Sequence, residues 1–371
     1  MTIEPLAQGK TLGILGGGQL GRMIAQAAKR LGYRTAALDP SATSPAMQIV
    51  DVPVVASVND DVAALTLAVA SDVVTLEWEL IATPVLEEVA KTRPLYPAPS
   101  VLEVIQDRLV QKNFLARHGF PQTPYGEVTI ATRWTFPCVI KKRVHGYDGK
   151  GQFSAELPED TPKAGEVLKE ECIWESKVPF EREISVILAR DREGGVAVYP
   201  VAENLHRGGI LHATRAPARI DEATAEKAVV LARQIAEKLG HVGVMAVEMF
   251  LLKDGTLLIN EIAPRVHNSG HYTLGGCAVS QFEQHVRAVC GLPLGETTLS
   301  GPATMVNLLG DLWEKGEPNW SSLDAVPNLV VHLYGKTEAR RGRKMGHYTV
   351  VGANADEEFD RADERLQALS R

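Results

Sequence analysis

The chain has 371 residues, more than one ordinary hydrophobic core accommodates, so two or three domains are expected. Hydrophobic residues make up 45% and charged residues 23% of the chain, a composition that excludes a disordered protein. The formal net charge of -7 argues against general nucleic-acid binding, which depends on a broad basic surface.

The sequence also argues against a membrane or secreted protein. No apolar run reaches the roughly 20 residues that a membrane-spanning helix needs, and the start, MTIEPLAQGK, lacks a signal-peptide pattern. Four cysteines are scattered without CxxC spacing and are expected to be buried free thiols. We therefore expect a cytoplasmic protein with no membrane partner.

The first hundred residues alternate strand-like apolar runs with helical patterns. The strand-like runs occupy 11–18, 34–40 and 71–79, and a helical pattern occupies 21–32. This alternation predicts βαβ repetition and a parallel sheet, that is, an N-terminal Rossmann-like domain over residues 1–100. The proline-rich stretch 92–100 is the predicted boundary.

Residues 101–297 are predicted to form an α+β domain with a lid subdomain around 125–185. One amphipathic helix is expected to open it and to end at Gly119, and a helix over 224–239 is expected to pack on strands. The strand-like runs are 136–143, 172–178, 182–191 and 243–261. A small C-terminal domain over 298–371 is predicted to hold strands within 302–310 and 330–352 and a last helix over 357–369.

The segment GGGQLG at 16–21 follows a strand-like run and opens a helical pattern, so it fits GxGxxG, and Asp39 ends the next strand. One hypothesis is therefore a nicotinamide-dependent oxidoreductase. The physical content of the motif is broader, because backbone N–H groups at a helix N-terminus suit any anion or polar small molecule.

The stretch VEMFLLKDGTLLINE predicts a hairpin with two acids facing each other. If Asp254 and Gly255 are the centre of the turn, Glu248 lies opposite Glu261, and a three-residue loop would break this pairing. Opposed like charges destabilise a hairpin unless something compensates. A divalent cation would do so, and carboxylate oxygens, with Asn260 nearby, favour magnesium; a local Lys or Arg partner is the alternative.

Lys141 ends a strand-like run, and the glycine-rich segment GYDGKGQ follows at 146–152. It lacks the Walker pattern, yet a flexible loop flanked by lysines is suited to covering nucleotide phosphates. A glycine-rich turn without function is the alternative for this loop alone. Combined with a paired-carboxylate magnesium site, the loop indicates nucleotide chemistry.

Two further clusters carry charge. In NEIAPRVHNSGH, at 260–271, the spacing of His267 and His271 suggests zinc with Glu261, a hypothesis that the hard oxygen ligands disfavour, and His271 is expected to be structural. GKTEARRGRKMGH, at 335–347, is either a solvated basic surface or a phosphate site.

In their order along the chain, ILGGGQLGRM, GYDGKGQ, NEIAPRVHNSGH and GRKMGH resemble the ATP-grasp superfamily and, within it, the N5-carboxyaminoimidazole ribonucleotide synthetase family. The resemblance covers essentially the full length. It implies ATP and Mg²⁺ as cofactors and a carboxyphosphate intermediate made from bicarbonate. The amine of 5-aminoimidazole ribonucleotide would then be carboxylated, as a step of purine biosynthesis, in a homodimer without a nucleic-acid partner.

The resemblance also implies roles for individual residues. ATP would contact Arg108, Lys141, Gly146, Tyr147, Asp148, Gly149, Lys150, Gly151, Gln152, Glu175, Ser176, Lys177, Val178, Glu183, His206, Asn260 and Glu261. The ribonucleotide would contact Gln19, Leu20, Glu77, Asp148, Lys336, Arg343 and Lys344. Magnesium would bind Glu248 and Glu261, while Arg265 and His267, assisted by Asn268 and Tyr147, would hold bicarbonate and then carboxyphosphate.

One departure concerns an acid-aromatic-acid-asparagine stretch that is common in the family. Here it reads EWEL, with Leu80 in place of asparagine, which puts Glu79 in doubt but not Glu77. Three alternatives remain: another ATP-grasp ligase that uses formate, the nicotinamide oxidoreductase, and a nucleic-acid binder based on the basic cluster. A requirement for bicarbonate, binding of NAD and salt-dependent binding of RNA or DNA would distinguish them.

Overall fold

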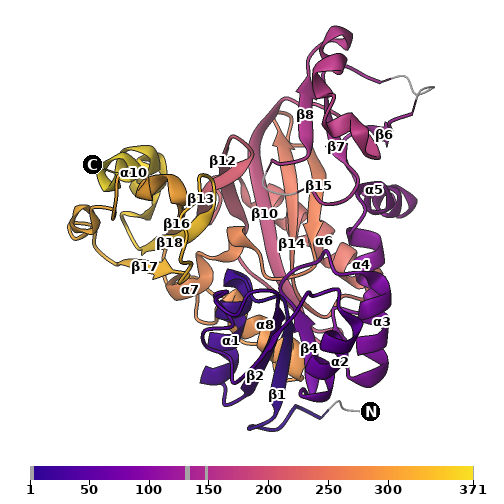
Figure 1. Ribbon diagram of the computed structural model, residues 1–371. Coiled ribbons are helices and arrows are strands. Elements are labelled where there is room, and N and C mark those ends of the chain that lie inside the picture. Colours follow the sequence, from indigo (N-terminus) through magenta and orange to yellow (C-terminus); the bar gives the residue numbers. More distant parts are fainter. Residues whose placement is uncertain (1–3, 130–133, 147–148, 371) are drawn as a thin grey trace.

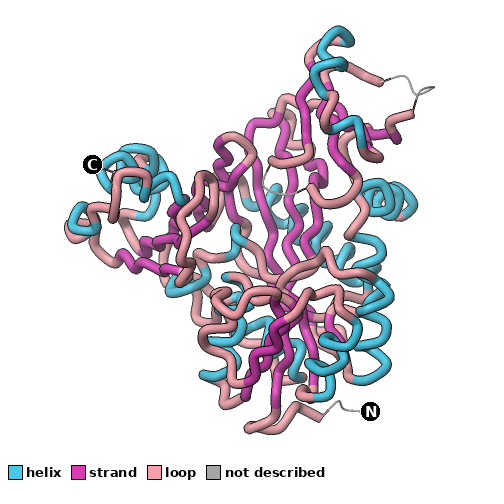
Figure 2. Tube along the Cα trace, in the orientation of Figure 1, coloured by secondary structure: helices cyan, strands magenta, loops and turns pink. Residues whose placement is uncertain are grey.

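The computed structural model describes residues 4–129, 134–146 and 149–370. Two residues of the predicted site, Tyr147 and Asp148, lie outside this range. Within it, no helix is long and apolar enough to cross a membrane. Figures 1 and 2 show a parallel sheet with its helices at the bottom, a lid at the top and the C-terminal region at the side of a long central sheet.

The N-terminal region contains the predicted parallel sheet, in the order β3-β2-β1-β4-β5. Its strands are β1 (Thr11–Leu15), β2 (Arg34–Asp39), β3 (Val52–Val55), β4 (Val73–Leu76) and β5 (Leu95–Tyr96). The crossover helices are α1 (Gln19–Arg30), α2 (Asp61–Val69) and α3 (Thr83–Thr92). Every residue of β1 and β4 is buried, which explains why both strands read as continuous apolar runs.

The predicted helix up to Gly119 is two helices, α4 (Pro99–Ile105) and α5 (Arg108–Arg117). The sequence prediction of one helix is wrong because Asp107 adopts an extended conformation and caps α5. Its carboxylate accepts hydrogen bonds from the backbone N–H groups of Leu109 and Val110, at 2.8 and 3.3 Å. The break places Arg108 at the start of α5, facing the central sheet.

The lid is a four-stranded antiparallel sheet in the order β6-β9-β7-β8. Its elements are β6 (Tyr125–Glu127), β7 (Cys138–Lys142), β8 (Gln152–Ala155), β9 (Cys172–Ser176) and two 3-10 helices, Pro158–Ala164 and Val167–Lys169. A small apolar cluster that includes Ile140 and Trp174 holds it together. The lid therefore has a core of its own.

The central sheet has nine strands, and its path is β15-β14-β10-β12-β13-β16-β18-β17, with β11 beside β10. The strands are β10 (Phe180–Arg190), β11 (Val196–Val198), β12 (Ala202–Arg207), β13 (Ile210–Ala216), β14 (Gly243–Leu252), β15 (Leu257–Ala263), β16 (Ala303–Leu309), β17 (Leu329–Leu333) and β18 (Lys344–Val351). Since β16 pairs with β13, the strands of the C-terminal region continue the central sheet (Figure 1).

Helices cover the central sheet and join it to the N-terminal region. The long helix α6 (Glu222–Leu239) is capped by Asp221 and begins at Glu222, two residues before the predicted start. It is followed by Gly240 in the left-handed conformation. The other helices are α7 (Thr273–Gly276), α8 (Gln281–Cys290), α9 (Ala355–Asp360) and α10 (Ala362–Leu369), and three 3-10 helices span Asn268–Gly270, Gly310–Trp313 and Trp320–Leu323. The predicted last helix is thus two short helices, α9 and α10.

The helix α8 packs between α1 and β14. Its His285 accepts a hydrogen bond from the backbone N–H of Val244 at 3.0 Å and lies 2.7 Å from the hydroxyl of Thr75 in β4. All three groups are buried. This contact fixes the parallel sheet against the central sheet, and with it the cavity between them.

Candidate active site

A cavity of about 500 Å³ lies where the N-terminal region, the lid, the central sheet and the C-terminal region meet. Predicted residues in its wall are Gln19, Leu20, Glu77, Arg108, Lys141, Gly146, Gly149, Lys150, Gln152, Glu183, His206, Glu248, Asn260, Glu261, Arg265, His267, Asn268 and Lys344. Six further residues of the wall are not among the predicted site residues: Trp78, Glu79, Val139, Gly209, Leu211 and Phe250. Chemistry-bearing residues from distant parts of the sequence therefore share one space.

One face of the central sheet supplies the acidic floor. Side chains alternate along a strand, so Glu183 and Ser185 of β10 project from the same face. The register pairs Ser185 with Glu248 and Glu183 with Phe250, which places all four side chains on this face. The opposite face carries buried Ile184, which belongs to the main apolar core.

The predicted pairing of Glu248 with Glu261 is confirmed, but the turn differs from the prediction. Leu252 donates its backbone N–H to the carbonyl oxygen of Thr256 at 2.9 Å, so three residues form the turn and Gly255 has a φ of 82°. A β-bulge beyond the turn shifts the register by one residue and restores the pair. Because the bulge lies at Asn260, this residue and the next, Glu261, both face the cavity.

The two glutamates differ in their electrostatic environment. Burial and the nearby carboxylates of Glu261 and Glu183 raise the pKa of Glu248 to about 7. Burial acts in the same direction on Glu261, yet Arg108, whose guanidinium lies 2.8 Å from its carboxylate, holds the pKa of Glu261 below its ordinary value. Burial and neighbouring carboxylates thus disfavour the charged form of Glu248, and a divalent cation bound by oxygen ligands would stabilise that form.

Glu175, a predicted ATP contact, is not part of the cavity wall. Its carboxylate is buried against Lys112 and Lys141, each 2.9 Å away, and accepts a hydrogen bond from the hydroxyl of Thr123 at 2.7 Å. Burial would raise the pKa of Glu175, but the two lysines hold it well below its usual range. Glu175 therefore positions Lys141, whose Nζ lies 3.3 Å from the amide oxygen of Asn260.

The glycine-rich loop lies against a second glycine turn. A Cβ atom added at Gly209, between β12 and β13, would lie 2.7 Å from the Cα of Gly149. Both residues have positive φ angles, 81° and 74°. Arg108 ties the loop down from the other side by donating to the carbonyl oxygen of Gly146 at 3.2 Å. Only residues without side chains permit this contact between the lid loop and the central sheet.

The GxGxxG segment is occupied by side chains of the protein itself. Asp39 accepts a hydrogen bond from the N–H of Gly17 at 2.9 Å, and Glu77 accepts from the N–H groups of Gly18 and Gly21 at 3.0 and 3.1 Å. Burial raises the pKa of Glu77. Two carboxylates therefore stand where a dinucleotide pyrophosphate would need the same N–H groups, and this argues against the nicotinamide hypothesis.

Arg265 lies at the junction of β15 with the N-terminal region and forms a two-point ion pair with Glu79. One of the two contacts, from a terminal guanidinium nitrogen, is 2.7 Å long. Another terminal nitrogen donates to the carbonyl oxygen of Val266 at 3.1 Å. Although partial burial acts in the opposite direction, Glu79 raises the pKa of Arg265, so this half-buried guanidinium remains charged. Glu79, which the Leu80 departure had put in doubt, therefore has a definite partner.

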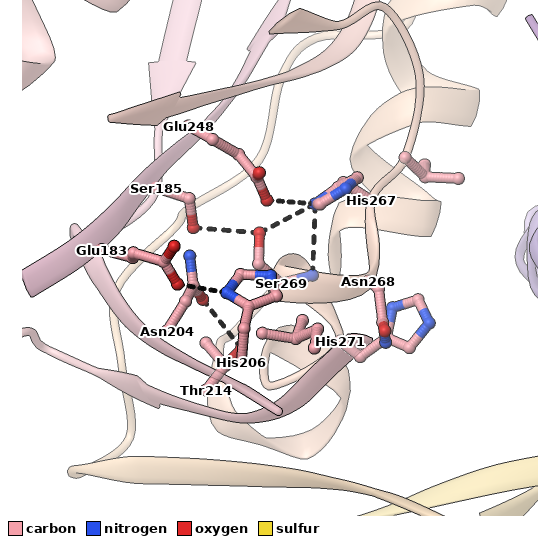
Figure 3. A network of polar contacts seen from close by, with 12 residues as sticks. Glu183, Ser185, Asn204, His206, Thr214, Glu248, His267, Asn268, Ser269 and His271 are labelled. Atoms are coloured by element: carbon pink, nitrogen blue, oxygen red, sulfur yellow. Dashed lines mark hydrogen bonds and ion pairs between the residues drawn. The ribbon is translucent and has the colours of Figure 1, made fainter. Parts of the chain in front are cut away.

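His267 caps the 3-10 helix Asn268–Gly270, so that His267 and Asn268 follow Arg265 closely along the chain. Figure 3 shows His267 and Asn268. Asn268 exchanges two hydrogen bonds, of 3.1 and 2.8 Å, with the amide of buried Asn307 in β16. His271 is only 1% exposed and faces away from the cavity, where its Nδ1 accepts from the amide of Gln281 at 3.0 Å. Among the described residues, no group of three or more His, Cys, Asp or Glu side chains is placed to hold a metal ion, so the zinc hypothesis has no support.

Other predicted contacts do not reach the cavity wall. These residues are Gly151, Glu175, Ser176, Lys177, Val178, Lys336 and Arg343. The Lys177 ammonium pairs with Glu156, that of Lys336 donates to the carbonyl oxygen of Lys344 at 2.6 Å, and Arg343 donates to the carbonyl oxygen of Glu338 at 2.7 Å. These basic groups have partners within the protein. Of the predicted residues in the basic segment 335–347, Lys344 lines the cavity.

Three family models match successive parts of the chain. They are a ribonucleotide synthetase preATP-grasp domain over residues 9–106, an ATP-grasp domain over 114–282 and a phosphoribosylaminoimidazole carboxylase C-terminal domain over 303–361. The order matches the N-terminal parallel sheet, the central region with its lid, and the last strands and helices. The fold and the cavity thus define an ATP-grasp ligase.

Relatives narrow this class. The N5-carboxyaminoimidazole ribonucleotide synthase of Brucella melitensis is 46% identical over 93% of this chain and 97% of its own, and that of Bacillus subtilis is 42% identical over 96% and 95%. A crystal structure of the Aspergillus clavatus synthase with ADP and 5-aminoimidazole ribonucleotide has a TM-score of 0.86 at 33% identity, covering 98% of this chain and 99% of that one. The chain belongs to the N5-carboxyaminoimidazole ribonucleotide synthase family.

Proposed function

We propose that the chain uses ATP and bicarbonate to carboxylate the amine of 5-aminoimidazole ribonucleotide, with release of ADP and phosphate, in purine biosynthesis. One observation carries this proposal. A single cavity brings together the acidic hairpin of Glu248 and Glu261, the lysine Lys141 and the cluster of Arg265, His267 and Asn268. These are a cation site, a phosphate partner and a small-anion site in mutual reach.

ATP would lie between the lid and the central sheet. Lys141 supplies a positive charge for the phosphates, and Glu183, already hydrogen-bonded to His206, supplies a carboxylate for the ribose hydroxyls. Glu248 and Glu261 would hold Mg²⁺, which supplies neutralisation of phosphate charge when bound. Gly149 of the glycine-rich loop lies against Gly209. A loop held there would exclude water and so protect a short-lived acyl phosphate.

The small anion and the ribonucleotide would lie toward the N-terminal region. Arg265 is fixed by Glu79 and, with His267 and Asn268, would orient bicarbonate and then carboxyphosphate, so catalysis rests on positioning and preorganised charge. Gln19, Leu20 and Glu77 would contact the aminoimidazole and ribose. Lys344, which lines the cavity, would balance the charge of the 5'-phosphate together with Lys336 and Arg343, which lie outside the cavity wall.

The proposal is tested by measuring ADP release with ATP, Mg²⁺ and 5-aminoimidazole ribonucleotide, with and without bicarbonate. We expect turnover to need both the ribonucleotide and bicarbonate. Turnover that formate supports in place of bicarbonate would assign a different ligase, and turnover indifferent to the ribonucleotide would refute the substrate.

We further propose a cytoplasmic homodimer. The absence of a membrane-spanning helix among the described residues is compatible with this location. Light scattering should give twice the chain mass of 40.2 kDa, and a mass of one chain at micromolar concentration would refute the dimer.

A further inference from the structure

The ring nitrogens of His267 have different environments (Figure 3). The backbone N–H of Ser269 points at Nδ1 from 3.3 Å, and the hydroxyl oxygen of Ser269 lies 2.9 Å from the same atom. Nδ1 also lies 3.8 Å from the Glu248 carboxylate, too far for a hydrogen bond. Nε2 has no hydrogen-bond partner among the described residues. Since His267 lines the cavity, a ligand there could contact this atom.

A backbone N–H can only donate, so Nδ1 must accept, and a neutral imidazole that accepts at Nδ1 carries its proton on Nε2. The serine hydroxyls agree with this assignment. Ser185 donates its hydroxyl to the oxygen of Ser269 at 2.9 Å, which leaves the single hydrogen of Ser269 for Nδ1. Both serines are fully buried, so water does not compete for these groups.

The backbone that presents His267 is fixed as well. The side-chain amide of Gln281 accepts from the N–H of His267 at 3.0 Å and donates to its carbonyl oxygen at 2.7 Å. A Cβ atom at Gly270 would lie 2.5 Å from the Gln281 amide oxygen, so the turn needs glycine there. The ring is therefore held at its Nδ1 edge and at its backbone, with the Nε2 edge left for a ligand.

We propose that Ser269, backed by Ser185, is a positioning residue that holds His267 in the Nε2–H tautomer, so that His267 donates a hydrogen bond to the small anion and does not remove its proton. This deepens the proposed function, on which its kinetic test rests. The opposite tautomer would turn a lone pair toward an anionic oxygen, which repels it. The backbone N–H and the hydroxyl of Ser269 thus act together, so that the N–H of Nε2, and not a lone pair, faces the anion.

The tautomer can be measured without activity. The imidazole ¹⁵N spectrum of histidine-labelled protein distinguishes Nε2–H from Nδ1–H, and the His267 signals are assigned by their loss in His267→Gln. We expect Nε2–H in the native enzyme. An Nδ1–H assignment would overturn the proposal even if the enzyme lacked the proposed activity, so the two failures are distinguishable.

Kinetics supply the second test. Ser269→Ala removes the hydroxyl that accepts from Ser185 and donates to Nδ1 of His267, and it keeps the backbone N–H. We expect the KM for bicarbonate to rise about tenfold while the KM for ATP stays within about twofold. Ser185→Ala should give a smaller rise in the same constant. The matched control is Ser71→Ala, since Ser71 is also buried but donates only to the carbonyl oxygen of Leu67 in the N-terminal region. A bicarbonate KM in Ser269→Ala equal to that of Ser71→Ala would refute the positioning role.

His267→Gln separates a donor from a base. The glutamine amide N–H2 can donate from near the position of Nε2 but cannot accept a proton in catalysis. We expect kcat/KM for bicarbonate to fall by no more than about tenfold, whereas loss of a general base would cost about 10²-fold to 10⁴-fold. A fall in kcat/KM of about 10²-fold or more would overturn the proposal.

Discussion

Replacement of Lys112 by methionine should destabilise the protein and weaken ATP binding, although Lys112 itself is not in the cavity wall. Lys112 is 2% exposed and pairs with Glu175, which is also buried and holds Lys141. Removing one partner of a buried ion pair costs about 3 to 5 kcal/mol. Since Lys141 and the Thr123 hydroxyl still contact Glu175, we expect about 3 kcal/mol, measured as a shift of the urea unfolding midpoint.

The same change should raise the KM for ATP about fivefold to tenfold, about 1 kcal/mol, because Lys141 then compensates Glu175 alone and is less available to phosphate. Lys238→Met is the matched control, since Lys238 is an exposed residue of α6 and its loss should cost less than about 0.5 kcal/mol. Lys112→Met with Glu175→Gln completes a double-mutant cycle. Strict additivity in this cycle, or a stability loss no larger than that of the control, would refute the reasoning.

Four further expectations follow from the structure. Arg265→Ala should lower bicarbonate-dependent ADP release by about 10²-fold or more and leave the circular dichroism spectrum unchanged. Retained turnover would contradict the anion role. Glu248→Gln should raise the Mg²⁺ concentration needed for half-maximal turnover about tenfold, and an unchanged requirement would exclude it as a ligand. Asn307→Ala should raise the KM for bicarbonate several-fold, about 1 kcal/mol, because two hydrogen bonds that orient Asn268 are lost; an unchanged KM removes that link. Burial lowers the pKa values of His241 and His285 to about 4 and about 3, so below pH 6.5 the unfolded state binds more protons than the folded state. Unfolding free energy should therefore fall between pH 6.5 and pH 4, by about 2 kcal/mol per histidine at pH 5, and equal urea midpoints at pH 7.5 and pH 5 would contradict this.

The acidic hairpin shows how a sequence argument can reach the right pair through a wrong intermediate. The pairing of Glu248 with Glu261 was predicted from a turn centred on Asp254 and Gly255. The turn has three residues, which alone would separate the pair, and the bulge at Asn260 corrects the register. Period-two patterning finds a hairpin, but a bulge depends on twist and on contacts with neighbouring strands, which local sequence does not encode.

The prediction of a single helix up to Gly119 was wrong for a similar reason. Its apolar spacing is helical throughout, and only the capping hydrogen bonds of Asp107, together with its ion pair to Arg143 in the lid, 2.6 Å long, favour a break. That partner is distant in the sequence. The consequence matters for the site, because the break directs Arg108 to Glu261.

Sequence by itself determined the parallel sheet, the order of the regions and most residues of the cavity wall. Apolar periodicity, glycine positions and the order of motifs are properties of the sequence, so they can be recognised without knowing the tertiary contacts. Tertiary structure alone decided which charges are buried together. In the folded protein, Glu175 pairs with Lys112 and Arg265 pairs with Glu79. Asp39 and Glu77 accept hydrogen bonds from the N–H groups of GxGxxG. The physical reason is that the free energy of a charge depends on its desolvation and its neighbours within a few ångströms, and those neighbours come from other regions of the chain.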